Sequence, residues 1–217
     1  MSHPRAFLVV AAVAAIGAQA QAQNLLNNPG FEAPLGFDFS NVLNWNGFFG
    51  GPAGTFLEAF NTTGAAPHAG AAALVTTVRA GAHPTGFNAF TGHVQTVPGV
   101  AVGGLYELSI WARLNPSVNN GAEFRIEWWG GSGKISELNS VVSGLLTADY
   151  QQFTISDIAP AGAVEARIVM AVQSFTNNGS PADTSVAWDD ASFSRIPTPG
   201  ALSLLAVVGM GVARRRR

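Results

Sequence analysis

The amino-acid sequence predicts an all-β protein, an antiparallel β-sandwich of the jelly-roll type. Short segments that alternate apolar and polar residues recur along the chain, clusters of glycine, proline and asparagine separate them, and helix signals are almost absent outside the two ends. The 25 glycines and 12 prolines describe a turn-rich chain, and the 14 phenylalanines and five tryptophans argue against disorder. About eight strands at this spacing are expected to form two packed sheets.

Three segments carry the clearest strand pattern. In "LYELSIWARL", which starts at Leu105, Tyr106 and Ile110 lie on one face while Trp111 and Arg113 lie on the other. The segments "EFRIEWWG" and "EARIVMAVQ" alternate in the same way, which gives each strand one core face and one outward face. Further strands are expected at residues 71–79, 93–97, 150–155 and 185–195.

The first 22 residues have the pattern of a secretory signal peptide. Arg5 supplies positive charge, residues 6–16 supply an apolar stretch, and the small residues that follow offer cleavage after Ala20 or Ala22. The apolar stretch is well short of the roughly 20 residues that a membrane-spanning helix needs. Export is therefore favoured over a retained N-terminal anchor.

Residues 24–196 are expected to form one domain, because no linker, low-complexity tract or internal repeat interrupts them. The chain has no cysteine, so packing, hydrogen bonds or a metal must hold this domain together. Between Asn24 and Ile196, six basic residues stand against 13 acidic ones, a net charge of −7. Such a domain lacks the basic stripe that phosphate binding needs, so nucleic acid is not expected as a partner.

Six short motifs in this domain occur in an order that resembles a known superfamily. They are "NLLNNPGFE" from Asn24, "NW" from Asn44, "HAGAAAL" from His68, "VQTVPG" from Val94, "GLYELSIWAR" from Gly104 and "VAWDDASF" from Val186. Together they resemble the carbohydrate-binding modules of the galactose-binding-like jelly-roll superfamily, especially the xylan- and glucan-binding groups of bacterial glycanases. The resemblance is more specific for the fold than for a ligand. It also implies that Trp45 is packed in the core, where strand parity places Trp128.

The resemblance implies a structural calcium ion, held by an acidic residue after the opening Gly-Phe and by an aspartate on the last strand. The matching residues are Glu32 and Asp189. An ion that takes about six to eight oxygens would close a sandwich without disulfides by joining its first strand to its last. Asp189 shares parity with Ala191 and Phe193 and is expected to point inward. The alternative is that Glu32 caps a turn and Asp189 makes an ordinary buried hydrogen bond.

Members of the superfamily bind sugar in a groove on the concave sheet or at the loop tips. Sugars present C–H faces that stack on aromatic rings, and hydroxyls that need paired donors and acceptors. The alternative is a solvated sheet on which Arg and Glu side chains pair across strands. The candidate ligand-binding residues lie on the outward faces of the three clear strands: Glu107, Trp111, Arg113, Arg125, Glu127, Trp129, Arg167 and Gln173.

The sequence shows no constellation that indicates catalysis. A glycosidase needs two carboxyl groups about 5 to 9.5 Å apart around a cleft. Glu123 and Glu127 on one face of a regular strand would lie roughly 13 Å apart. "GGSGK" from Gly130 is expected to be a hairpin turn and not a phosphate loop, and the four histidines show no zinc or triad spacing. The chain is therefore expected not to be an enzyme.

The C-terminal 21 residues form a separate segment from 197 to 217. Pro197, Thr198 and Pro199 are followed by an uncharged, largely apolar run to residue 213 and then by four arginines: Arg214, Arg215, Arg216 and Arg217. This order resembles the PEP-CTERM sorting signals that exosortases process in Gram-negative bacteria, with threonine in place of the usual glutamate. Terminal arginines would hold that end on the cytoplasmic side of the inner membrane. A permanent tail anchor needs only the same hydrophobicity and is the alternative.

These observations predict an exported, non-catalytic protein of a Gram-negative-type bacterium, located at the cell surface or in the extracellular matrix. It is expected to bind polysaccharide or other matrix material and to be a substrate of an exosortase-type sorting protease. Two alternatives are a purely structural surface or biofilm protein without a glycan site and, less favoured, a glycan-active enzyme with an undetected cleft.

Overall fold

The computed structural model describes residues 22–32, 42–50, 57–62, 66–78, 89–115, 121–173 and 183–197. These residues form ten β-strands and no helix, which confirms the predicted all-β class. Apart from Ala22 and Pro197, the predicted signal peptide and sorting segment lie outside the described residues. No helix within the described ranges is long and apolar enough to span a membrane.

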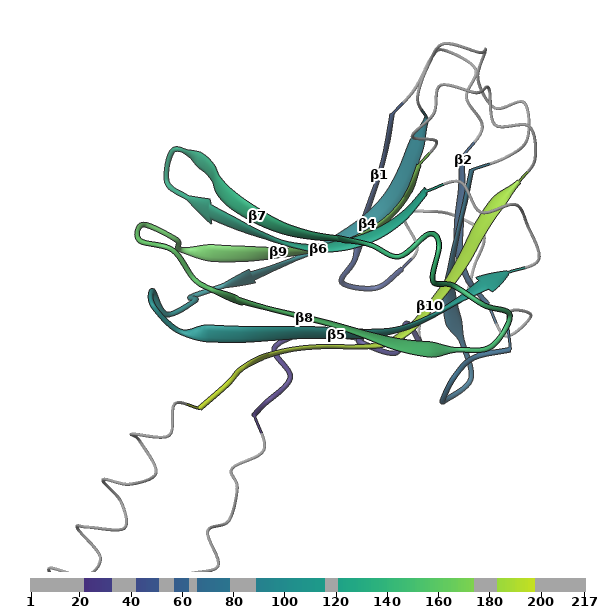
Figure 1. Ribbon diagram of the computed structural model, residues 1–217, viewed down its shortest axis with the longest axis horizontal. Helices are drawn as coiled ribbons and strands as arrows, with labels where there is room; N and C mark the ends of the chain where they lie inside the picture. The colour runs from purple at the N-terminus through teal and green to yellow at the C-terminus, as the bar shows by residue number, and fades with distance from the viewer. Residues whose placement is uncertain are drawn as a thin grey trace, which may run out of the picture.

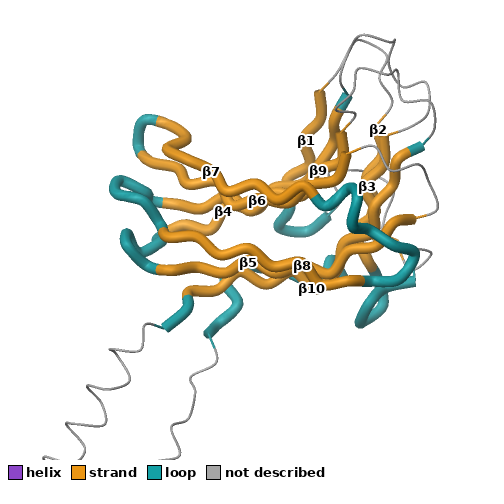
Figure 2. Tube along the Cα trace, viewed as in Figure 1, coloured by secondary structure: helices purple, strands orange, loops and turns teal. Residues whose placement is uncertain are grey.

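The strands form two five-stranded antiparallel sheets that pack face to face (Figures 1 and 2). The first, here called the front sheet, has the order β1-β4-β9-β6-β7, and the second, the back sheet, has the order β2-β3-β10-β5-β8. The strand bounds are β1 Asn46–Gly50, β2 Leu57–Thr62, β3 Ala73–Val78, β4 Phe90–Pro98, β5 Leu105–Asn115, β6 Gly121–Gly130, β7 Gly133–Val141, β8 Gln151–Ile158, β9 Glu165–Gln173 and β10 Thr184–Arg195. The front sheet is the upper layer in Figure 1, and its edge strand β1 rises steeply from the rest, so its outer face is concave.

The core lies between the two sheets and is rich in aromatic rings. Trp45 and Trp128 are both buried, as predicted from the sequence. The rings of Tyr106 and Phe193 stack with centroids 5.2 Å apart, and Tyr106 meets Trp128 edge-on at 5.6 Å. The polar end of Trp128 is satisfied, because its Nε1 donates a hydrogen bond to Asp157 at 2.8 Å. Aromatic burial of this kind supplies stability in a chain that has no cysteine and therefore no disulfide.

The N-terminal segment pairs with the last strand and ties both sheets together. Leu25 N donates to the carbonyl of Phe193 at 2.8 Å, and the Asn24 side chain bonds the Phe193 amide and the Ala191 carbonyl, each at 3.0 Å. Asn27 then exchanges two backbone hydrogen bonds with the Gln95 side chain on β4, at 2.7 and 2.8 Å. The segment that follows residue 23 therefore closes the seam between β10 and the front sheet.

All seven segments expected to be strands are strands, and three strands were not foreseen: β1, β2 and β7. β7 is mostly exposed along its length, because it lies at the edge of its sheet and has polar residues on both faces. β1 has the sequence "NGFFG", which carries no alternation. The expected hairpin turn after Gly130 is present and links β6 to β7.

The prediction that Asp189 points inward is wrong. A β-bulge interrupts the pairing of β10 with β5 between Asp189 and Ser192, and Asp190 within it has a φ of 44°. The bulge adds one residue, so parity counted back from Phe193 fails at this point. Asp189 lies opposite Trp111 on the outer side of the back sheet, where other side chains and a loop bury it.

We expect the substitution Asn24→Ala to lower the free energy of unfolding by about 1 to 2 kcal/mol, because it leaves two backbone groups of β10 without their partner. Urea denaturation followed by tryptophan fluorescence measures this loss. Asn27→Ala is the matched control, since Asn27 is exposed and bonds Gln95 through its backbone alone. Equal stability of the two variants would contradict the closure of the seam by Asn24.

Candidate functional site

The outer face of the front sheet has a floor of small residues along its central strand, β9. Val169 and Ala171 point outward, as the alternation predicted, yet each is only 2% exposed. Their neighbours on β4 are Val94 and Gly92. A side chain at position 92 would collide with the carbonyl of Met170, so the floor stays low at this point.

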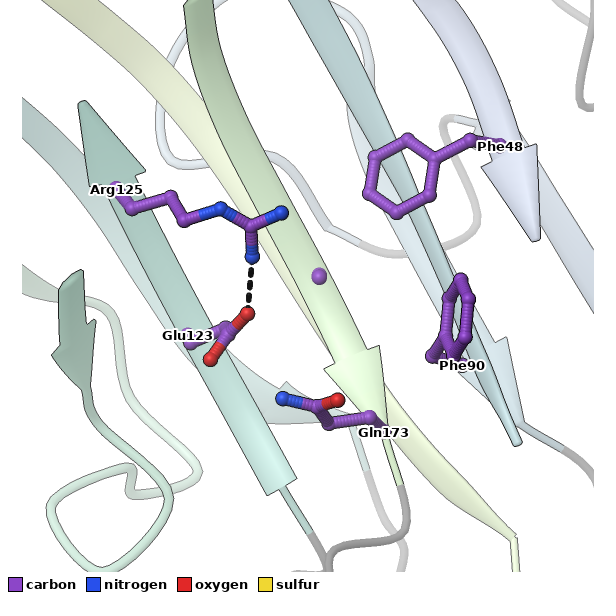
Figure 3. A pocket seen from close by; sticks show the side chains of 6 residues that line it. Phe48, Phe90, Glu123, Arg125 and Gln173 are labelled. Carbon is purple, nitrogen blue, oxygen red and sulfur yellow. Dashed lines mark hydrogen bonds and ion pairs between the residues drawn. The ribbon is translucent and has the colours of Figure 1, made fainter. Parts of the chain in front are cut away.

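One wall of this face is aromatic. Phe48 on β1 and Phe90 on β4 lie with their ring centroids 6.3 Å apart, tilted by 49° (Figure 3). Phe48 lies over Gly92, where a Cβ would be 2.6 Å from its ring, and Phe90 covers Gly50. The glycines on the two neighbouring strands therefore make the room that lets both rings lie close to the sheet.

The opposite wall is polar and is built around Arg125 on β6. Its Nε donates to Glu127 at 2.8 Å, and its Nη1 pairs with Glu123. The other oxygen of Glu123 accepts from Asn139 at 2.7 Å, and that of Glu127 accepts from Trp129 Nε1 at 3.0 Å. Both carboxylates are thus occupied in holding one guanidinium, which extends over β9 toward Phe48 (Figure 3).

The electrostatics of this wall keep Glu127 ionised. Burial alone would raise the pKa of the Glu127 carboxyl, but hydrogen bonds from Arg125 and Trp129 and the charges of Arg125 and Lys134 outweigh it and lower the pKa. The group is therefore a fixed anion near neutral pH and holds Arg125 in place.

The two walls enclose a groove that runs along β9. Two pockets of about 150 and 200 Å³ share Phe48 and Arg125 as lining residues. The first extends to Phe90 and Gln173, and the second extends to Arg167. Since positions 167 and 173 are six residues apart on one strand, the groove is roughly 20 Å long.

At the Arg167 end of the groove, one face of Trp129 is already covered. The Arg167 guanidinium lies 3.7 Å from the centroid of the Trp129 ring, and its Nε bonds Glu165 at 3.0 Å. This cation–π contact fixes Arg167 above the ring. A ligand at this end would therefore meet the guanidinium before it meets that face of the indole.

The structure divides the eight predicted ligand-binding residues between two opposite faces. Five of them lie on the outer face of the front sheet: Arg125, Glu127, Trp129, Arg167 and Gln173. The other three lie on β5 in the back sheet: Glu107, Trp111 and Arg113. The split arises because β5 and β6 follow each other in the chain but belong to different sheets, so their outward faces point in opposite directions.

The sequence reasoning did not identify the aromatic wall. Phe48 belongs to the strand that was not foreseen, and Phe90 precedes the segment 93–97 that was predicted as a strand. Glu123 also lines the groove, although it is not one of the predicted ligand-binding residues. A usable signal was present in the glycines at positions 50 and 92, because glycine within a strand often marks a close approach.

A second cluster of functional groups lies on the outer side of the back sheet, around Asp189. Its carboxylate accepts hydrogen bonds from the backbone amides of His68 at 2.8 Å, Ala69 at 3.3 Å and Asp190 at 2.8 Å. The His68 ring bonds Asp190 through Nδ1 at 2.7 Å and stacks on Trp111 with centroids 3.9 Å apart. Trp111 thus covers Asp189 together with the loop that contains His68.

Burial raises the pKa of Asp189 to about 6. The neighbouring charge of Asp190 adds to this rise, while the backbone amides that bond the carboxylate oppose it. A buried anion beside a second anion indicates a place where a cation would be stabilising.

Glu32 joins this cluster from the N-terminal segment, where it lies on the same side of Gly30 as Asp190. Its carboxylate accepts from Ala71 N at 2.9 Å, and a Cβ built at Gly30 would lie 3.6 Å from both Glu32 Oε1 and Asp190 Oδ1. Gly70 has a φ of 65°, and a Cβ there would strike the Glu32 carboxylate.

The donor set suits calcium, which prefers carboxylate and carbonyl oxygens. No group of three or more His, Asp or Glu side chains among the described residues is placed to hold a metal ion. Backbone carbonyls would therefore have to complete the coordination around Glu32 and Asp190.

Comparison with known proteins gives no match to a family model and none to a curated protein. Solved structures do match. The enzymatically active domain of tailspike protein 4 from bacteriophage CBA120 has a TM-score of 0.59 at 17% identity over 80% of this chain, which spans only 21% of that chain.

Carbohydrate-binding modules are the commonest neighbours among the solved structures. The CBM22-1 xylan-binding domain of Paenibacillus barcinonensis Xyn10C has a TM-score of 0.51 at 14% identity, over 82% of this chain and 97% of that one. The CBM22-1-CBM22-2 tandem of the same enzyme gives 0.53 at 14% identity, over 82% of this chain and 47% of that one. At these identities the likeness shows a shared β-sandwich fold.

With a chelator present, we expect the contribution of Asp189 to the stability of the full chain to fall as pH rises from about 4 to 6. The pKa of Asp189 is raised to about 6 by folding from an ordinary 3.8, so the folded state binds the proton more tightly and loses stability as the proton leaves. Urea midpoints at a series of pH values measure the slope. Asp189→Asn should flatten the slope of the urea midpoint against pH. Asp149→Asn, at an exposed position, is the control and should keep the slope. An unchanged slope in Asp189→Asn would contradict a raised pKa at Asp189.

Proposed function

We propose that the protein binds polysaccharide without catalysis and that the front-sheet groove holds the glycan chain. The observation that carries this proposal is the arrangement of an aromatic wall, Phe48 and Phe90, opposite a polar wall centred on Arg125, across a floor of small residues. Aromatic rings suit the C–H faces of sugars, and a fixed guanidinium with flanking carboxylates suits their hydroxyls. The groove is long and open, which suits a chain more than a single sugar.

The charges of the groove support binding over hydrolysis. A glycosidase needs a carboxylic acid with a raised pKa to protonate the leaving oxygen. In the groove, the pKa of Glu127 is lowered, and both Glu123 and Glu127 are engaged with Arg125. Neither carboxylate has the environment of a general acid. The alternative function, a structural surface protein without a glycan site, is tested by the same binding experiment.

We further propose that the protein is exported and sorted as its two ends suggest. In this proposal residues 1–22 direct export, an exosortase-type enzyme reads the segment from Pro197, and the domain acts at the cell surface or in the extracellular matrix. A surface location agrees with a domain that has no cysteine and carries a net charge of −7. The domain also has few of the lysines and arginines that would bind nucleic acid.

Calcium is proposed as the ion of the cluster that contains the predicted ligands Glu32 and Asp189, with Asp190 beside them. It would neutralise carboxylates that lie close together and link the N-terminal segment to the loop around Gly70 and to β10. Its role would be structural, because the cluster lies on the back sheet and the groove lies on the front sheet.

We expect calcium to raise the melting temperature of the full chain and magnesium to raise it less, because calcium accepts irregular oxygen coordination whereas magnesium demands near-octahedral geometry. Glu32→Gln should remove most of the calcium effect, whereas Glu137→Gln, at an exposed position on β7, should keep it. Differential scanning calorimetry with and without a chelator measures the shift. An equal calcium shift in both variants would place the ion elsewhere.

We expect Phe48→Ala to weaken binding to polysaccharide at least tenfold, which corresponds to about 1.4 kcal/mol. Affinity electrophoresis of the full chain in gels containing xylan, galactan or β-glucan measures this change. Phe49→Ala is the matched control, because Phe49 is the next residue on β1, is 59% exposed and does not line the groove.

The back sheet supplies the second control. Trp111→Ala should keep the affinity, because Trp111 stacks on His68 on the opposite face from the groove. Loss of binding in Trp111→Ala with full binding in Phe48→Ala would move the glycan site to the back sheet. Absence of retention on every polysaccharide by the folded wild type would favour the structural alternative.

A further inference from the structure

We propose that one end of the sandwich rests on the surface of a lipid bilayer. This end, here called the uncharged end, consists of three loops at residues 98–104, 130–133 and 158–164. The inference rests on the proposed C-terminal sorting segment, whose apolar run would enter the inner membrane, and extends the membrane contact to the folded domain.

Backbone hydrogen bonds hold the three loops together as one surface. Gly103 N donates to the carbonyl of Ala159 at 2.8 Å, and Gly99 N donates to that of Val164 at 2.9 Å. Val164 N in turn donates at 2.9 Å to the carbonyl of Trp129, which directly precedes the loop 130–133. The three loops therefore form a continuous end of the molecule.

The composition of this end differs from that of the rest of the domain. None of the three loops contains a charged residue, although the domain around them carries 19 charged residues. Large apolar side chains are exposed on them and beside them: Val102 at 55%, Val164 at 55%, Ile158 at 57% and Ile135 at 44%. Single exposed apolar residues are ordinary, but several together on uncharged loops indicate a contact surface.

The last described residues of the chain lie at the same end. Ile196 N donates to the carbonyl of Leu105 at 2.9 Å, directly after the loop 98–104. The apolar run starts three residues after Pro197, at Gly200, and so within about 11 Å of it even if the chain is fully extended. A run that enters a bilayer from so short a connection would bring the uncharged end against the lipid surface.

The chemistry of the end favours lipid over a sugar or a polar partner. Its loops carry no aromatic ring and none of the Arg and Glu side chains that line the groove. Its border carries charges of both signs: Lys134 and Arg195 are exposed, while Asp157 and Glu165 flank the loop 158–164. Lys134 is already paired with Glu137 at 2.7 Å, so the apolar side chains carry the preference for lipid. The branched apolar side chains would enter the boundary between headgroups and acyl chains.

This placement sets the direction of the groove. β9 starts at Glu165, directly after the loop 158–164, so the Arg167 end of the groove lies near the uncharged end. The Phe48 and Phe90 end lies toward the other end of the strands and away from the bilayer. A polysaccharide chain would therefore reach the aromatic wall from the side that faces away from the membrane.

The absence of cysteine allows a direct test by single labels on the full chain. Val102→Cys and Ile158→Cys carry an environment-sensitive fluorophore at the uncharged end. Leu145→Cys is the matched control, because Leu145 is 59% exposed and lies at the opposite end, where Leu145 N bonds the Val142 carbonyl and β5 ends. The labelled chains are reconstituted into vesicles of phosphatidylethanolamine and phosphatidylglycerol, with and without headgroup-region spin-labelled lipid as quencher.

We expect a blue shift and loss of most of the emission at positions 102 and 158, and no change at position 145. Flotation with the vesicles but no quenching at 102 or 158 would overturn the proposal and leave the C-terminal membrane segment intact. Failure of the labelled chains to float with the vesicles would overturn both the lipid contact of the uncharged end and the membrane contact of the C-terminal segment. Equal quenching at positions 102, 158 and 145 would indicate that the whole domain adsorbs to the vesicles without a preferred face, and this result would also overturn the proposal. Glycan binding is tested in a separate experiment with Phe48→Ala, so a failure of the glycan proposal can be told apart from a failure of the lipid proposal.

A second measurement separates lipid contact from contact between copies of the chain. Val102→Asp combined with Ile158→Asp should reduce the quenching of a label at Val164→Cys by the spin-labelled lipid, whereas Leu145→Asp should leave that quenching unchanged. The blue shift of the label at position 102 is also measured without lipid. A blue shift that grows with protein concentration would show that a second copy of the chain covers the uncharged end, and this result would overturn the proposal.

Discussion

The proposed function depends on the small size of the side chains on the outer face of β9. This strand is the central strand of the front sheet, and its outward residues Val169 and Ala171 are small enough to form a floor below taller neighbours. Gly92 extends that floor, because the Met170 carbonyl and the Phe48 ring occupy the space that a Cβ would need. Large side chains at these positions would fill the groove and leave a flat sheet with paired charges.

The polar wall fixes the position of the Arg125 guanidinium more than it adds to the folding stability of the domain. Half-buried ion pairs gain little net free energy, because desolvation offsets their attraction. Glu123 and Glu127 hold the guanidinium of Arg125 from two sides, and Asn139 and Trp129 fix the carboxylates in turn. The network therefore pre-orders the side chain that would face the proposed ligand, which would reduce the entropy lost on binding.

The sequence predicted the architecture better than the site. Alternation located β5, β6 and β9, because one face of each strand packs in the core and the other does not. It could not say which sheet each strand joins, so Trp111 and Trp129 seemed to share a face that the structure divides. The bulge at Asp190 is a local departure that parity cannot anticipate. Phe48 was missed because β1 carries glycines where a strand pattern needs side chains.

Methyl NMR of the full chain tests the central claim most directly. Val94, Val169 and Ala171 form the groove floor, and Ala73, Val75 and Ala187 form a buried patch on the outer side of the back sheet. Titration with xylohexaose, β-1,4-galactotriose or other oligosaccharides should shift the first set of methyl signals and leave the second unchanged. Shifts confined to the back-sheet methyls, or no shift with any oligosaccharide, would contradict a glycan site in the groove.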